Sequence, residues 1–226
     1  MRYILTLLCI SFIIACNQSD PDHKPMPVDT SHTSKSEKTP ATDTTTTGTK
    51  KDGSLNLKSK DSLLMKLSVE ILASLKTKDL VKLASFVHPT AGIRFSPYAY
   101  IDTINGQVVS ATKLIALAKQ QTTVKWGVYD GSGETIKLSI DKYFERFVYS
   151  KDFLNAEKKS VNTSNKTGNS LDNLEVVHPG SDYTEFYFSG FDPKFEGMDW
   201  QKLRLVFRIE NRKPYLLAII HDEWTI

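Results

Sequence analysis

The segment Leu203–Ile220 reads LRLVFRIENRKPYLLAII, and its apolar pattern predicts two long strands joined by a tight turn. Apolar side chains recur at every second position from Leu203 to Ile209, as in a strand with one face in the core. The polar residues Asn211-Arg212-Lys213 then turn the chain. The six consecutive apolar residues Tyr215–Ile220 suit a central strand that is buried on both faces. An antiparallel pair of strands is therefore expected at the centre of a sheet.

Amphipathic helices are expected to precede this sheet. Between residues 61 and 76, apolar side chains recur every three or four positions, which is typical of one buried helix face. Asp79 is placed to cap a second helix over residues 80–87, which His88-Pro89 ends. Ser110 is placed to cap a third helix.

Shorter strands are expected between these helices and the long hairpin. A turn at Asp130–Gly133 separates two apolar runs and predicts a small hairpin, and Ser139 opens a short aromatic helix. The polar stretch 155–170 is expected to be an exposed excursion. The remaining predicted strands cover residues 93–96, 174–177 and 183–188.

Helices followed by a run of antiparallel strands indicate an α+β domain, expected over residues 60–226. The opening of this domain resembles the NTF2-like superfamily, which includes the SnoaL-like cyclases and the ketosteroid isomerases. Such domains open with a helix, a charged break that ends in Asp, a second helix and a strand. Here Leu75–Leu80 (LKTKDL), Phe86 and Gly92–Phe95 (GIRF) match that order. The resemblance implies N-terminal helices packed on a curved antiparallel sheet, as in the NTF2-like or cystatin-like cone.

The N-terminus reads MRYILTLLCISFIIAC and predicts a signal peptide. The apolar run over residues 3–15 would reach roughly 20 Å as a helix, which is short of a bilayer core of about 30 Å. Its end, Ile13-Ile14-Ala15-Cys16, resembles the lipobox of bacterial lipoproteins. That resemblance implies cleavage before Cys16 and diacylation of the Cys16 sulfur. The alternative is a plain secretory signal in which Cys16 is incidental.

The lipoprotein interpretation divides the chain into three parts. Residues 1–15 are the signal peptide, and residues 16–59 are the lipidated cysteine followed by a disordered linker rich in Ser, Thr and Pro. Cys9 lies in the removed segment, so the mature chain has no second thiol for a disulfide or a thiolate metal site. We expect a protein attached to the cell envelope by lipid. Asn17 after the cysteine favours the outer membrane where the cell has one.

Composition and charge exclude several classes of function. The 226 residues include 29 basic and 26 acidic side chains, a balance without the basic field of a nucleic-acid-binding protein, so no such partner is expected. The charged fraction of 24% excludes a protein with many membrane spans. His88, His178 and His221 lack the spacing of metal ligands, so neither a metal nor a cofactor is expected.

The weak candidates for catalysis are His221, Asp222 and Glu223, which lie in the run His221-Asp222-Glu223-Trp224. On a strand, His221 and Glu223 would face one side and Asp222 and Trp224 the other. An acid–base pair could be formed from His221 and one of the two carboxylates. The alternative is a polar strand end with Trp224 anchoring the C-terminus.

A further resemblance, to a set of uncharacterised bacterial lipoproteins, implies no activity. It rests on segments 86–89 (FVHP), 94–98 (RFSPY), 126–133 (WGVYDGSG) and 221–224 (HDEW).

We expect a non-enzymatic module that binds a small ligand or an envelope protein, with Arg94, Tyr98, Trp126 and His221 as candidate ligand contacts. Arg94 could bind a carboxylate or form a structural ion pair. The aromatic loop 191–200 could rim a ligand site or fold back on the core. Two alternatives are a hydrolase or isomerase that uses His221, and a protein that forms homodimers through an open sheet face.

Overall fold

A computed structural model describes residues 56–165 and 171–225 of the chain. The described helices are α1 (Leu57–Lys76), α2 (Leu80–Phe86), α3 (Ala111–Gln120), α4 (Ile140–Phe147) and α5 (Leu174–Val177), with short 3-10 turns η1 (Phe153–Asn155) and η2 (Pro193–Phe195). The strands are β1 (Ile93–Ser96), β2 (Gln107–Val109), β3 (Val124–Val128), β4 (Thr135–Leu138), β5 (Lys158–Val161), β6 (Asp182–Phe188), β7 (Gln201–Glu210) and β8 (Lys213–Glu223). The predicted signal peptide and most of the predicted linker lie outside the described residues.

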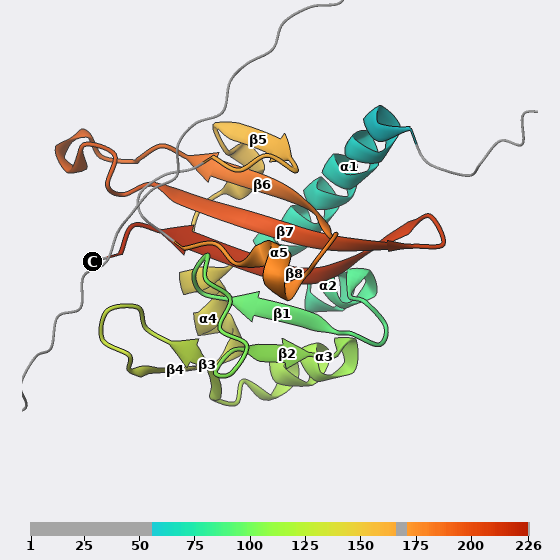
Figure 1. Cartoon of the computed structure of the whole chain (residues 1–226). Helices are drawn as coiled ribbons and strands as arrows, with labels where there is room; N and C mark the ends of the chain where they lie inside the picture. The colour runs from blue at the N-terminus through green and yellow to red at the C-terminus, as the bar shows by residue number, and fades with distance from the viewer. Residues whose placement is uncertain (1–55, 166–170, 226) are drawn as a thin grey trace, which may run out of the picture. The chain divides into compact units, whose positions relative to one another are not determined.

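Six strands form the main sheet in the order β2-β1-β8-β7-β6-β5, and β3 and β4 form a separate hairpin (Figure 1). The long pair β7 and β8 is antiparallel, with Leu205 opposite Ile219, which confirms the predicted hairpin. The pairing of β1 with β8 is parallel and places Phe95 opposite Ile219. The expected α+β class is confirmed, with helices and a curved sheet that is mostly antiparallel.

The helix starts follow local chemistry that the sequence displays. The Asp79 carboxylate accepts the backbone N–H of Lys82 at 2.8 Å, and the Ser110 hydroxyl accepts that of Lys113 at 3.2 Å. Both side chains satisfy amide groups that the first helical turn leaves free. Both predicted caps are therefore confirmed, and they set the directions in which α2 and α3 leave the preceding loops.

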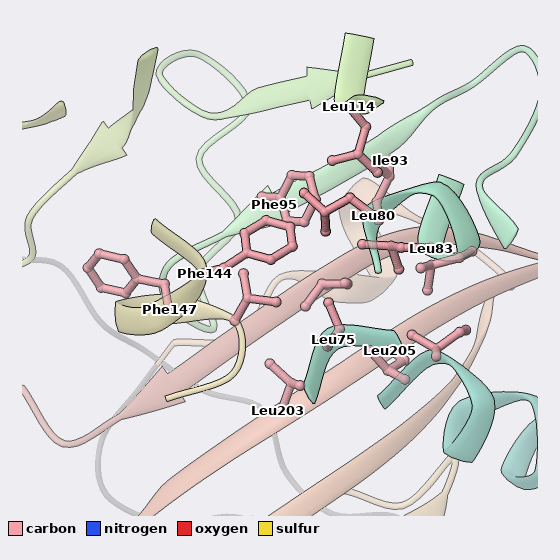
Figure 2. Packing of buried hydrophobic residues seen from close by; sticks show 14 of the residues in the cluster. Leu75, Leu80, Leu83, Ile93, Phe95, Leu114, Phe144, Phe147, Leu203 and Leu205 are labelled. Atoms are coloured by element: carbon pink, nitrogen blue, oxygen red, sulfur yellow. The ribbon is translucent and has the colours of Figure 1, made fainter. Parts of the chain in front are cut away.

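The main core lies between the helices and one face of the sheet (Figure 2). Leu75, Leu203 and Leu205 meet there from α1 and β7, and all three are almost fully buried. A smaller cluster lies on the opposite face of the sheet and includes Ala218 and Ile220 of β8. β8 is thus buried on both faces, as its unbroken apolar run predicts.

An aromatic cluster closes one end of the main core. Phe95 of β1 contacts the edge of Trp126 at a centroid distance of 5.7 Å, and Trp126 stacks on Tyr143 at 4.4 Å. Phe144 lies 5.3 Å from the Phe95 ring. Offset and edge-to-face pairs of this kind add to the stability that apolar burial provides. They attach the β3–β4 hairpin and α4 to the main sheet.

Three predicted boundaries or element types were wrong. Residues 174–177 form the helix α5 instead of a strand, because β5 and β7 already occupy both edges of β6 and leave no ladder partner there. Part of the polar stretch 155–170 forms the edge strand β5, whose exposed side tolerates polar residues. α1 begins at Leu57, inside the predicted linker 16–59.

Replacing Phe95 with Ala should destabilise the fold strongly, because it opens a cavity among three aromatic neighbours. The expected loss in the free energy of unfolding is about 3–5 kcal/mol, measured by urea denaturation. Phe195→Ala is the matched control, since that ring is partly exposed and its loss should cost at most about 0.5 kcal/mol. Equal losses in the two variants would contradict this description of the core.

Candidate functional site

A cavity of about 540 Å³ lies between the chain that follows β1, the β3–β4 hairpin and the end of β8. Its walls carry several aromatic rings and a few polar groups. Among the lining residues are Ser96, Tyr98, Tyr100 and Asp102 from the first segment, Trp126, Val128, Tyr129 and Asp130 from the second, and Asp222 and Thr225 from the third. Ligand sites in proteins are typically concave, largely apolar and of this size.

The first wall is held by hydrogen bonds to the loop after β1. The Ser96 hydroxyl donates to the backbone oxygen of Tyr98 at 2.8 Å. The amide side chain of Asn173 accepts the N–H of Ile101 at 2.8 Å and donates to its oxygen at 3.2 Å. Asp102 accepts the N–H groups of Ile104 and Asn105, both at 2.8 Å. These bonds hold Tyr98 and Tyr100 on an ordered loop.

The second wall is the β3–β4 hairpin. The strand register shifts between Lys125 and Gly127, and Gly127 has a φ of 143°, so the chain kinks next to Trp126. The Trp126 indole N–H donates to the Leu138 oxygen at 2.9 Å across the hairpin. The Asp130 carboxylate accepts the Thr225 hydroxyl at 2.5 Å, which ties the hairpin turn to the C-terminal segment.

The end wall includes Asp222, which belongs to a buried ion pair. Lys202 Nζ lies 3.1 Å from the Asp222 carboxylate, and both side chains are less than a tenth exposed. Beside it, Arg204 Nη2 lies 2.9 Å from Glu185, and Arg204 Nη1 lies 2.7 Å from Asp172. Such pairs stabilise only when each charge keeps its partner, because desolvation of an unpaired ion is costly.

We call the side chains of these ion pairs the charged row; they are Lys202, Asp222, Arg204, Glu185 and Asp172. The pKa shifts of two of them agree with these contacts. Burial opposes the charge on Arg204, yet the carboxylates of Asp172 and Glu185 hold its pKa above the usual value. Burial would raise the pKa of Asp172, but the N–H of Leu174 and the Arg204 guanidinium bring it below the usual value. Arg204 and Asp172 therefore keep their charges at neutral pH.

Sequence reasoning missed this charged row. Lys202 and Arg204 alternate with apolar residues along β7, and that pattern predicted only that the apolar positions face the core. In the structure, neighbouring segments cover this face, including Ser164, whose hydroxyl accepts from Arg204 at 3.0 Å. The alternation of polar and apolar residues along β7 cannot show that another segment covers the strand, because that segment is distant in the sequence.

The structure brings two of the four predicted ligand contacts to the cavity. Tyr98 and Trp126 line it, and Arg94 and His221 do not. Arg94 forms no ion pair with any described residue, and burial lowers its pKa while Asp102 partly opposes that shift. The expected structural ion pair of Arg94 is therefore absent from the described part of the chain.

His221 lies on the helix side of β8 and is fully buried. Its Nδ1–H donates to the Pro97 oxygen at 3.1 Å, and its ring meets Phe147 edge-on at 5.9 Å. Burial lowers the pKa of His221 to about 4. The imidazole is therefore neutral at physiological pH and packed in the core, where it contacts Pro97 of the cavity wall but does not itself line the cavity.

The predicted catalytic run is brought together only in part. Glu223 pairs with Arg146 and its carboxylate also lies 3.9 Å from His221 Nε2, whereas Asp222 pairs with Lys202. Within the residues that the structure describes, no three His, Cys, Asp or Glu side chains gather as a metal would require. His221 and Asp222 leave opposite faces of β8, so they cannot act as one acid–base pair. Trp224 is partly exposed and does not anchor the C-terminus in the core.

The aromatic loop 191–200 rims a second, smaller cavity of about 380 Å³. Asp199 accepts the N–H groups of Phe191 and Asp192 at 2.9 and 2.8 Å, which shapes the loop. Phe191 and Phe195 remain partly exposed, whereas Trp200 is buried. Of the two expected arrangements, the rim of a cavity is the one observed.

The chain matches none of the protein-family models, curated proteins or solved structures with which it was compared. Of the described helices, none has the length and apolar character to cross a bilayer. The site must therefore be interpreted from its own residues.

Acidification should destabilise the fold through His221. Its pKa is about 4 when folded and about 6.5 when unfolded, so between these values the unfolded chain binds a proton that the folded chain does not. Stability is then full above about pH 6.5 and falls towards pH 4, by on the order of 3 kcal/mol from this group.

The measurement is urea denaturation at about pH 7 and about pH 4.5. His221→Gln keeps a donor for the Pro97 oxygen and does not titrate, so it should lose less stability than the native chain between these pH values. The same pH dependence in both proteins would show that His221 does not carry this effect.

Proposed function

We propose that this chain is a bacterial lipoprotein of the cell envelope whose domain binds a small ligand in the cavity beside Tyr98 and Trp126. The proposal rests on that cavity of about 540 Å³, which combines aromatic walls with a few polar groups. Small-molecule sites typically have this composition, in which the apolar wall supplies affinity and the polar groups supply orientation.

The polar groups around the cavity favour recognition over catalysis. Asp102 orders a loop, Asp130 holds Thr225, and Asp222 is paired with Lys202. General acid–base chemistry needs a titratable group within reach of the substrate. His221, on which the hydrolase or isomerase alternative depends, lies 3.9 Å from Glu223, but it is fully buried and outside the lining of the main cavity, so it does not meet a ligand there.

The homodimer alternative required an open sheet face. That face carries a buried cluster of Ile101, Leu174, Val206 and Ile220. The loop after β1 contributes Ile101, and helix α5 contributes Leu174. Segments of the same chain cover part of this face, which leaves less apolar surface for dimerisation through the sheet.

We propose an NTF2-like cone for the domain. In support, α1 ends at Lys76, Lys78 has a positive φ of 56°, and Asp79 caps α2, which leads on to β1. This is the helix, charged break, helix and strand that the resemblance implies at residues 75–95.

Blocking the cavity should abolish ligand binding without unfolding the domain. A thermal-shift screen of small molecules on the unlipidated mature chain should find stabilising ligands, and Val128→Trp should remove their effect because Val128 lines the cavity. Val81→Trp is the matched control, since Val81 is exposed on α2 and lies outside the lining. If no compound stabilises the native chain, or if both variants respond alike, the binding proposal fails.

Lipidation should depend on Cys16 alone. Cys16→Ser should abolish incorporation of labelled palmitate and release the protein from the membrane fraction, because the serine hydroxyl cannot form the thioether. Cys9→Ser is the matched control and should be lipidated normally. Mass spectrometry of the native N-terminus checks both results, and an unmodified thiol at Cys16 would favour a plain secretory signal. Since residue 17 is Asn, we propose the outer membrane where the cell has one.

A further inference from the structure

The charged side chains that line the main cavity all have the same sign. Asp102, Asp130 and Asp222 contribute carboxylates, and among the described residues no Lys, Arg or His belongs to the lining. The three carboxylates do not gather into a metal-binding group among the described residues, so they lie apart around the walls. This arrangement suits an extended organic ligand better than a single ion.

For two of these carboxylates, neighbouring groups of the protein balance the negative charge. Asp222 is paired with Lys202 at 3.1 Å. Asp102 accepts N–H groups of its own turn, and the charges of Arg94 and Lys125 act on it from beyond ion-pair distance. The negative charges of the end wall and of the first wall are therefore largely balanced.

Asp130 is different, because no cation lies within ion-pair distance of it in the part of the chain that the structure describes. Its hydrogen bonds come from uncharged groups, the Thr225 hydroxyl at 2.5 Å and the Gly131 N–H at 3.1 Å. The residue is exposed at the hairpin turn. Its carboxylate thus places an uncompensated negative charge on the cavity wall.

Tyrosine rings accompany this charge. Tyr98, Tyr100 and Tyr129 line the same cavity, and Tyr100 is 56% exposed. Burial raises the pKa of Tyr98, and hydrogen bonding to the Asp130 backbone partly opposes that shift. The faces of neutral aromatic rings attract cations and repel anions.

We propose that the ligand of this cavity is an organic ammonium cation with an apolar body, with its charge beside Asp130 and its body against Tyr98 and Val128. This inference rests on the proposed ligand-binding function and adds the chemical class. Anionic ligands would meet the Asp130 carboxylate and the negative faces of the rings. Uncharged ligands would gain only the apolar contact.

Three probes with the same apolar body test the class by isothermal titration calorimetry on the unlipidated mature chain. They are 2-phenylethylammonium, 2-phenylethanol and 3-phenylpropanoate. The ammonium should bind about fivefold more tightly than the alcohol, because of the Asp130 charge and the ring faces, and the carboxylate should bind most weakly.

Asp130→Asn removes the charge and keeps acceptors for Thr225 and Gly131. It should weaken ammonium binding about fivefold and leave alcohol binding unchanged. Asp61→Asn on α1 removes the same charge outside the lining and should change neither affinity. Equal affinities of ammonium and alcohol, tighter carboxylate binding, or an unchanged Asp130→Asn variant would each overturn the inference.

The outcome also separates this inference from the proposed function. If the cavity binds only uncharged or anionic compounds and Val128→Trp blocks them, the ligand-binding function holds and the cationic class is wrong. If neither these probes nor any screened compound binds, both fail.

Discussion

The burial of β8 on both faces and along both edges is the constraint on which the rest of this fold depends. β7 and β1 pair with its two edges, and its side chains alternate between the main core and the smaller cluster on the opposite face. At residues 218–220, where β1 and β7 both pair with it, β8 has backbone partners on both edges, and each of its faces needs a covering layer. α1, α2, α3 and α4 cover one face, and the loop after β1, together with α5, covers part of the other.

Covering the second face brings charged residues of β6, β7 and β8 into the interior. Lys202, Arg204, Glu185 and Asp222 become buried there, and each lies about 3 Å from an oppositely charged partner. Moving one member of this row would leave a buried charge without its partner, which is costly. Of the row, Asp222 lines the cavity, and Lys202 lies 3.1 Å from its carboxylate.

The cavity itself follows from the separation of two sheets. β3 and β4 pair only with each other, and aromatic contacts of Trp126 attach them to the main sheet near Phe95 and Tyr143. Aromatic packing fills the inner end of the space between the hairpin and β1, and the outer end stays open beside Tyr98 and Asp130. The same rings therefore contribute to stability and form the floor of the proposed binding site.

The sequence by itself determined the local features of this protein. The period-two pattern of β7, the apolar run of β8 and the caps Asp79 and Ser110 each depend on neighbouring residues, so their predictions held. It could place Tyr98 and Trp126 among the candidates, but it could not separate them from Arg94 and His221. Only the tertiary structure decided that α5 is a helix, that Lys202 and Arg204 are buried, and that His221 belongs to the core. The physical reason is that a pattern shows which residues share a face, whereas burial of that face depends on segments tens of residues away.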